Sequence, residues 1–126
     1  MSSESYHEPL DALSTETRLM HQALTSIQEE LDAVNWYRQR ADACSDEELK
    51  QILLHNMREE IEHACMVLEW VRRRNPDFAS QMETYLFTKA PITEVEEEEE
   101  GKGEDAPTST SNNKLSQFTI GNMKEK

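Results

Sequence analysis

Two acidic residues and a histidine stand at positions where helix packing would favour apolar side chains. Glu60 and His63, in the stretch REEIEHA (58–64), are three residues apart and therefore project from one face of a helix. That face is the stripe expected to lie against a neighbouring helix. An unpaired buried carboxylate costs several kcal/mol or takes up a proton, so these side chains need a partner. A divalent cation is one such partner, because carboxylate oxygens and imidazole nitrogens are its natural ligands.

Glu30 supplies a third ligand from the preceding helix. It lies on the inward side of that helix, between Ile27 and Val34. If the chain turns near residue 45, Glu30 and Glu60 are each about fifteen residues from the turn and lie at the same level, given about 1.5 Å of rise per residue. One Glu with one Glu-x-x-His is half the ligand set of a di-iron helical bundle. A twofold symmetric dimer would complete that set.

The Glu-x-x-His pattern alone has little specificity in a chain so rich in glutamate. Glu4 and His7 form a second match near the N-terminus. In the alternative interpretation, Glu60 and His63 face solvent or form salt bridges, for instance with Arg58 or Arg38. Two features favour the metal site. Glu60 lies at the same level of the hairpin as Glu30, and Glu60 and His63 both lie on the stripe that faces the neighbouring helix.

Two long amphipathic helices must position these residues. The first is predicted from about residue 8, with Pro9 in its first turn, to about Cys44. Its apolar positions alternate spacings of three and four, as in helices that pack side by side. They are Leu10, Leu13, Thr17 (the polar exception), Met20, Leu24, Ile27, Leu31 and Val34.

The second helix is predicted to begin at SDEE, with Ser45 as N-cap and Glu48 completing a capping box. Three arginines, 72–74, suit its C-terminal end. Its inward stripe is Leu49, Leu53, Asn56, Glu60, His63, Val67 and Trp70. A short third helix follows, capped by Asn75 with Pro76 in its first turn, and ends near Phe87.

The fold class predicted is therefore all-α: an antiparallel two-helix hairpin with a short third helix. Two such helices bury too little surface to be stable alone. We expect the hairpin to form an obligate oligomer, most simply a dimer with a four-helix arrangement.

Composition narrows the classes of function. The chain has 126 residues, of which 36% are hydrophobic, and a net charge of -13, which disfavours nucleic acid as a partner and favours cations. No apolar run is long enough to span a bilayer, and the N-terminus does not resemble a signal peptide. Cys44 and Cys65 form no CxxC pair and suit a reducing cytoplasm.

The predicted organisation has four parts. Residues 1–7 are a flexible N-terminus and residues 8–90 form the helical domain. Residues 91–114 form an acidic linker with too little apolar surface to fold. Apolar residues return in 115–126, which is either a docking peptide on a tether or a frayed tail.

Several stretches resemble the encapsulated ferritins. EELDAVNWYRQR (29–40), HNMREEIEHACMVLEWVRR (55–73) and TYLFTKAPIT (84–93) carry the resemblance, which covers about residues 7–95. FTIGNMK (118–124) is similar to the cargo-loading peptides that dock proteins inside encapsulin shells. Its Phe118, Asn122 and Met123 differ from the usual sequence of those peptides, while the apolar pattern around Gly121 is kept. The targeting residues implied are Phe118, Thr119, Ile120, Gly121 and Met123.

The resemblance implies a half-ferritin that forms a dimer and then a ring-shaped decamer, held inside an encapsulin nanocompartment of the cytoplasm. It implies a ferroxidase that binds two Fe(II) ions per dimer interface and oxidises them with dioxygen or peroxide. Glu30, Glu60 and His63 match the ligands, and Tyr37 matches a tyrosine beside the centre. Positions on the route of metal access correspond to Glu29, Asp32, Trp36, His55, Glu59 and Glu62.

The family often has Glu in place of Asp32. Calcium is a further ion that these outer positions could bind.

Two rival interpretations remain from the residues themselves. One is a non-catalytic helical module whose tail docks a partner. The other is a module bridged by zinc or calcium without redox chemistry.

Overall fold

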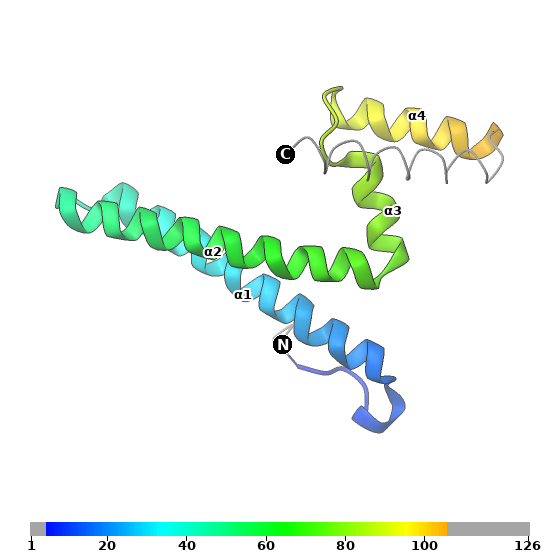
Figure 1. Ribbon diagram of the computed structural model, residues 1–126, viewed down its shortest axis with the longest axis horizontal. Coiled ribbons are helices and arrows are strands. Elements are labelled where there is room, and N and C mark those ends of the chain that lie inside the picture. Colours follow the sequence, from blue (N-terminus) through cyan, green and yellow to red (C-terminus); the bar gives the residue numbers. More distant parts are fainter. Residues whose placement is uncertain (1–4, 106–126) are drawn as a thin grey trace. The chain divides into compact units, whose positions relative to one another are not determined.

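The computed structural model describes residues 5–105, and every element in that range is a helix. Their order is a 3-10 helix η1 (Leu10–Ala12), α1 (Thr15–Ala43), α2 (Glu47–Arg74), α3 (Pro76–Tyr85) and α4 (Ile92–Asp105) (Figure 1). The chain divides into two compact units, the first ending at Arg74 and the second beginning at Asn75. The all-α class and the hairpin are thus confirmed.

The first unit is an antiparallel hairpin of α1 and α2 (Figure 1). α1 ends at Ala43, with Cys44 as C-cap, close to the predicted end. At the open end of the hairpin, Arg74 donates a hydrogen bond of 3.1 Å to Glu16 in the first turn of α1. Glu16 and Arg74 lie at nearly equal sequence distances from the turn. The two helices therefore stay in register from the turn to the open end of the hairpin.

The start of the first helix differs from the prediction. Ser14 has an extended backbone and its hydroxyl accepts a hydrogen bond from the Thr17 amide at 3.1 Å, so α1 begins at Thr15. Leu10 belongs to the separate η1, and Arg18 donates to its carbonyl oxygen. The residues before α1 fold back along it, because the Tyr6 ring stacks on His21 with centroids 4.0 Å apart.

The start of the second helix also differs. The carboxylate of Asp46, and not the Ser45 hydroxyl, accepts the hydrogen bond from the Leu49 amide, at 2.9 Å. α2 therefore begins at Glu47, and the predicted capping box of Ser45 with Glu48 is wrong. The charged acceptor is the better partner for amides at the positive end of a helix. The arginines at 72–74 close α2 as predicted.

The second unit contains α3 and α4, which pack on each other. Asn75 caps α3 by accepting from the Phe78 amide at 2.9 Å, with Pro76 at the first helical position, as predicted. Residues 92–105 form a helix where the sequence predicted a linker without a fold. Glutamate is a good helix former, and Val95 is buried, which gives α4 a packing contact. The remaining linker and the predicted docking peptide, 106–126, lie outside the described residues.

The core of the hairpin is smaller than the predicted seam. Its buried apolar residues are Ala23, Ala41, Ala64 and Val71. Small side chains such as alanine allow two helix backbones to approach closely. Leu31, placed on the seam by its spacing, is 55% exposed. The hairpin by itself therefore leaves large apolar side chains in solvent, which supports a need for partners.

No helix in the described range is long and apolar enough to cross a membrane.

Candidate metal centre

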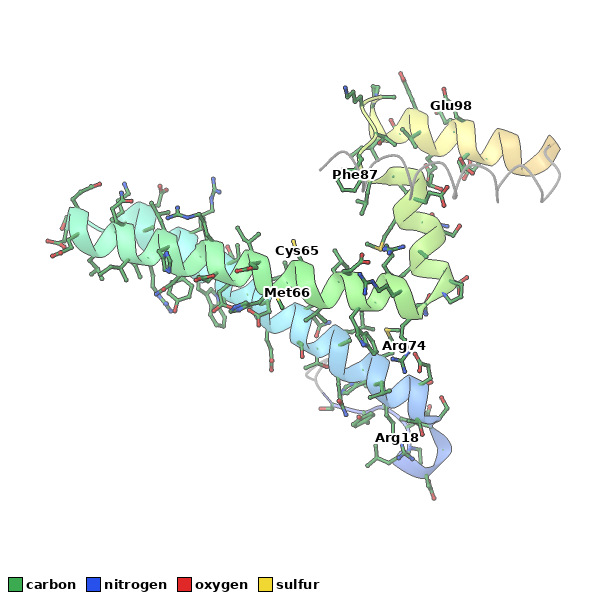
Figure 2. All side chains as sticks on the ribbon, viewed as in Figure 1. Arg18, Cys65, Met66, Arg74, Phe87 and Glu98 are labelled. Carbon is green, nitrogen blue, oxygen red and sulfur yellow. The ribbon has the colours of Figure 1, made fainter. Side chains whose placement is uncertain are left out.

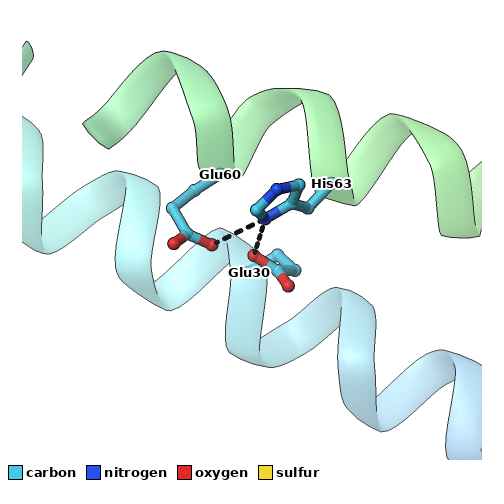
Figure 3. A group of neighbouring side chains, drawn as sticks. All are labelled: Glu30, Glu60 and His63. Atoms are coloured by element: carbon cyan, nitrogen blue, oxygen red, sulfur yellow. Dashed lines mark ion pairs between the residues drawn. The ribbon is translucent and has the colours of Figure 1, made fainter. Parts of the chain in front are cut away.

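The predicted triad comes together between α1 and α2. Glu30 projects from α1, and Glu60 and His63 project from α2, all toward one point (Figure 3). His63 Nδ1 lies 3.5 Å from a carboxylate oxygen of Glu60 and 3.6 Å from one of Glu30. One ligand atom from each side chain lies within 4.8 Å of the others. Residues far apart in sequence thus present two carboxylates and an imidazole to one small volume.

The cluster is partly buried and leaves an oxygen unsatisfied. The side chains of Glu30 and Glu60 are each 25% exposed and that of His63 is 49% exposed. Oε2 of Glu30 is buried and accepts no hydrogen bond. A buried acceptor without a partner is costly and rare in folded proteins. This oxygen therefore points to a ligand that is a cation.

The electrostatics of the cluster agree with that interpretation. The pKa of Glu30 is raised above its ordinary value, first by a hydrogen bond with the Glu60 carboxyl, then by desolvation and by repulsion from Glu60. His63 acts in the opposite direction and lowers it. Two carboxyl groups held this close favour a shared proton unless a positive charge replaces it. A divalent cation would supply that charge.

The donor set limits which metals fit. Two carboxylates and one imidazole suit iron, manganese or zinc better than thiophilic metals. One chain contributes three ligand atoms, which leaves coordination positions for a second chain, for water or for an oxidant. Among the residues that the structure describes, neither Arg38 nor Arg58 forms an ion pair with Glu60 or His63. The arginine partners suggested in the alternative interpretation are therefore not engaged, whereas His63 itself forms ion pairs with Glu30 and Glu60.

The other residues implied by the family resemblance lie outside the triad. Tyr37 is partly buried and Arg40 lies over its ring, 5.4 Å from the centroid. Trp36 is exposed, as are Glu29, Asp32 and Glu62. Roles for these residues in catalysis or metal access remain predictions.

His55 and Glu59 form an exposed pair one helical turn apart, with Nε2 and a carboxylate oxygen separated by 3.5 Å. In the described range only Glu30, Glu60 and His63 gather three potential ligand atoms so closely. The His55–Glu59 pair is thus a weaker candidate for a metal than the triad, and its predicted part in metal access is untested.

Sequence reasoning located the triad but not the residues that bring its helices together. Ala23 and Ala64 are buried near the same level of the hairpin, yet neither belongs to the predicted stripes. Alanines facing each other at roughly similar distances from the turn, Ala23 at 22 residues and Ala64 at 19, were the available signal. They escaped notice because alanine is also the commonest choice on exposed helix faces.

Comparisons with known proteins agree with the geometry. A model of the EncFtn-like family matches residues 5–89. The chain is 48% identical to the encapsulated ferritin-like protein of Rhodospirillum rubrum, over 98% of this chain and 90% of the relative. It is 30% identical to the encapsulin nanocompartment cargo protein EncC of Myxococcus xanthus, over 94% of this chain and 95% of the relative.

A solved structure is similar as well. The crystal structure of protein ne0167 from Nitrosomonas europaea is 56% identical in sequence to the matched part of this chain, with a TM-score of 0.68. The match covers 70% of this chain and 97% of the other.

Proposed function

The chain belongs to the EncFtn-like family, and from this premise we propose that it is a ferroxidase that oxidises Fe(II) to Fe(III) at a di-iron site shared by two copies of the chain. The observation that carries the proposal is the convergence of Glu30, Glu60 and His63, with an unsatisfied carboxylate oxygen among them. Iron is the substrate of this reaction.

A second copy is part of the proposal because one chain supplies half of a di-iron ligand set. In di-iron carboxylate bundles, the full set is a Glu from each of two helices and a Glu-x-x-His from each of two others. A twofold axis beside the triad would provide it from two hairpins. The exposed apolar residues of the hairpin, such as Leu31, support association. Assembly of dimers into a ring-shaped decamer is proposed from the family resemblance.

In the proposed reaction each side chain has a distinct part. Glu30 and Glu60 lose the proton they share and bind Fe(II) as anions, which offsets the rise in metal charge on oxidation. His63 completes the ligand set and influences the reduction potential of the iron. Two Fe(II) ions release two electrons, which together with two protons would reduce dioxygen to hydrogen peroxide, or hydrogen peroxide to two water molecules. Tyr37 is proposed to lie beside the centre.

Iron storage is proposed to take place in a surrounding shell. The relatives' names, encapsulated ferritin-like protein and encapsulin nanocompartment cargo protein, support an encapsulin compartment as the location. The sequence FTIGNMK (118–124) is the proposed docking segment. The exposed acidic side chains on both long helices are proposed to guide cations toward the triad, with calcium as an additional occupant of such outer positions.

Two experiments separate this proposal from its rivals. The first is aerobic oxidation of Fe(II), followed by absorbance, for the wild type, Glu30→Ala and His63→Ala, each sized at the same time. Glu97→Ala on α4 is a control for loss of an exposed glutamate away from the triad. The proposal requires that the control oxidise iron like the wild type and that both triad variants fall to the background rate. Wild-type activity at background would reject it.

The second experiment is an anaerobic titration with Fe(II), Zn(II) or Ca(II), followed by exposure to air. All three metals can bind a carboxylate-histidine site, but only iron can then consume oxygen. Zinc or calcium binding without any iron-dependent oxygen consumption would favour the metal-bridged module. No metal binding at all would favour the non-catalytic interaction module.

A further inference from the structure

The turn between α3 and α4 exposes three large apolar side chains within one short stretch of chain. Leu86, Phe87 and Ile92 are 40%, 68% and 71% exposed. Leu86 is the C-cap of α3 and Ile92 is the first residue of α4, so all three flank the same turn, where Phe87 is labelled in Figure 2. We name these three residues the turn patch. The metal centre uses none of them.

Hydrogen bonds and an unusual backbone angle shape the turn patch. The Leu86 amide donates to the Met82 carbonyl oxygen at 2.8 Å, and the Thr88 hydroxyl donates to that of Tyr85 at 2.7 Å. Between them, Phe87 has a φ of 65°, in the left-handed region that bulky side chains rarely adopt. Such strained positions gather where proteins bind ligands or switch conformation. The exposed ring of Phe87 is therefore a candidate binding element.

Acidic side chains of α4 continue the surface that begins at the turn patch. Residues four and eight positions after Ile92 follow it along one side of a helix, and these are Glu96 and Glu100. Both are exposed. Glu100 is about 12 Å from Ile92 along the helix axis. The surface thus presents apolar side chains at the turn and negative charge farther along α4.

The C-terminal part of the sequence carries the matching chemistry. Residues 106–126 lie outside the described residues, and their sequence has Lys114 four residues before Phe118. Four residues of extended chain span about 13 Å, which is close to the separation of Ile92 and Glu100 along α4. An aromatic side chain at the turn patch would therefore place the lysine beside the acidic side chain.

The chain is long enough to make this contact within one molecule. α4 is about 20 Å long from Ile92 to Asp105. Phe118 is thirteen residues after Asp105 and can be up to about 43 Å from it in an extended chain. The segment can therefore turn back along α4 and reach the turn patch. That direction also brings Lys114 to the side of Glu100, and a tethered segment has a high effective concentration at its site.

We propose that residues 114–120 dock on the turn patch of their own chain, with Phe118 against the apolar side chains and Lys114 paired with Glu100. The contact uses no residue of the triad and goes beyond the proposed iron chemistry. Opposite charges fix its direction, and burial of the apolar side chains supplies its attraction.

One consequence rests on the docking role proposed above for FTIGNMK (118–124). A segment that is held by its own chain binds any other site with an affinity lowered in proportion to the fraction that is undocked. The turn patch then competes with an encapsulin shell for the same segment. It acts as an internal inhibitor that a shell with the stronger site displaces.

The test is the rate at which chymotrypsin cleaves the full chain after Phe118, followed by mass spectrometry. A protease cleaves a docked segment only while it is released, so the rate reports the undocked fraction. A synthetic peptide of residues 113–126 gives the rate for the undocked sequence. The full chain should be cleaved at this bond about tenfold more slowly than the peptide. Cleavage of the full chain as fast as the peptide would overturn the proposal.

Substitutions identify the surface that protects the segment. Phe87→Gly removes the ring and suits the left-handed backbone, so the turn should persist while Phe118 is cleaved at the rate of the peptide. Glu100→Lys and Lys114→Glu should each raise the rate about threefold, measured against peptides of matching sequence. The double variant restores opposite charges and should return to the wild-type rate. Wild-type protection in Phe87→Gly, or a double variant that is not restored, would overturn the proposal.

A matched control makes the same change of charge on another side of α4. Glu98 is two residues before Glu100 and so lies more than a quarter turn around the helix from it. Glu98→Lys should leave the cleavage rate unchanged, and circular dichroism checks the helix content of each variant. A rise in rate for Glu98→Lys equal to that for Glu100→Lys would overturn the assigned pairing.

A mixture of single variants separates docking within one chain from docking between copies. Glu100→Lys and Lys114→Glu, refolded together, offer matched charges only across copies, so both should be cleaved as fast as they are alone. Restored protection in the mixture would overturn docking within one chain. Iron oxidation by Phe87→Gly should equal that of the wild type, because the triad is untouched, so a failure of the proposed ferroxidase reaction is seen separately.

Discussion

Nδ1 of His63 on α2 lies 3.6 Å from Oε2 of Glu30 on α1, and that oxygen is buried without a hydrogen bond. The hairpin thereby holds a carboxylate that can bind a proton or a metal ion but contributes little to the stability of the hairpin. Residues that bind substrate commonly carry such a cost. The relationship makes the trade-off between stability and activity measurable at Glu30.

Replacing Glu30 with glutamine should stabilise the metal-free protein and abolish iron oxidation. Because the folded protein raises the pKa of Glu30, folding favours its protonated form. The contribution of protonated Glu30 to the free energy of unfolding is fully present at pH values below the unfolded-state pKa. It is lost as the pH rises through the folded-state pKa. Glu30→Gln keeps the uncharged form at every pH. Thermal unfolding in EDTA at pH 7 should therefore show a higher Tm than wild type, at equal protein concentration.

The same variant should lose about 100-fold or more in the rate of Fe(II) oxidation, because a metal ligand is removed. Near pH 4, where wild-type Glu30 is itself protonated, the difference in Tm should shrink. An equal or lower Tm for Glu30→Gln at pH 7 would contradict the account of the cluster. Glu97→Gln, an exposed glutamate of α4, is the matched control.

Metal binding should release protons from the triad. The raised pKa of Glu30 means that this carboxyl holds a proton more readily than an ordinary glutamate does, and a cation must displace that proton. Anaerobic titration with Mn(II) in a weakly buffered solution should show proton release and an affinity that falls as pH decreases from neutral. Glu30→Gln should release fewer protons per metal bound. Proton release that is identical in both proteins would show that the metal binds elsewhere.

The cap of α2 gives a test of the local structure. Asp46→Ala should lower the free energy of unfolding by about 1 kcal/mol, because the Leu49 amide loses its acceptor. Ser45→Ala should change it by only a few tenths of a kcal/mol. Denaturant unfolding followed by circular dichroism measures both. A larger effect at Ser45 than at Asp46 would restore the capping box that the sequence predicted.

Glu69 should stabilise the C-terminal end of α2 only above acidic pH. Arg72 and Arg73 both donate to it at 2.7 Å, and these bonds, that of Arg72 first, lower the pKa of Glu69 to about 2. Because the pKa of Glu69 is lower in the folded state than in the unfolded state, its ionised form stabilises the fold at pH values above the unfolded-state pKa. This stabilisation is lost as the pH falls through the folded-state pKa. The side chain is 37% exposed, so solvent screening limits the contribution.

Glu69→Gln should accordingly lower the free energy of unfolding by about 0.5 kcal/mol at pH 7. The difference from wild type should shrink as pH falls from about 4.5 toward about 2, the ordinary and the folded pKa. Glu97→Gln, an exposed glutamate of α4, is the control and should leave the unfolding curve unchanged at every pH. A difference at Glu69 that persists undiminished at the acidic end would contradict this.

Several features of the protein follow from the sequence alone. The heptad spacing fixes two long helices, and the equal distances of Glu30 and Glu60 from residue 45 place both acids at one level. Asn75 with Pro76 identifies the start of α3. These are local or periodic properties, which depend on neighbouring residues and on the constant rise of a helix.

The tertiary structure decided what spacing could not. Two acceptors compete at the start of α2, and only the folded turn shows that Asp46 rather than Ser45 receives the amide hydrogen. Ala23 and Ala64 are buried, whereas Leu31, which its spacing placed on the seam, is exposed. Oε2 of Glu30 is buried and makes no hydrogen bond, although Nδ1 of His63 lies 3.6 Å from it. Register along a helix is a one-dimensional property, whereas burial and the satisfaction of a polar atom depend on how closely two backbones meet.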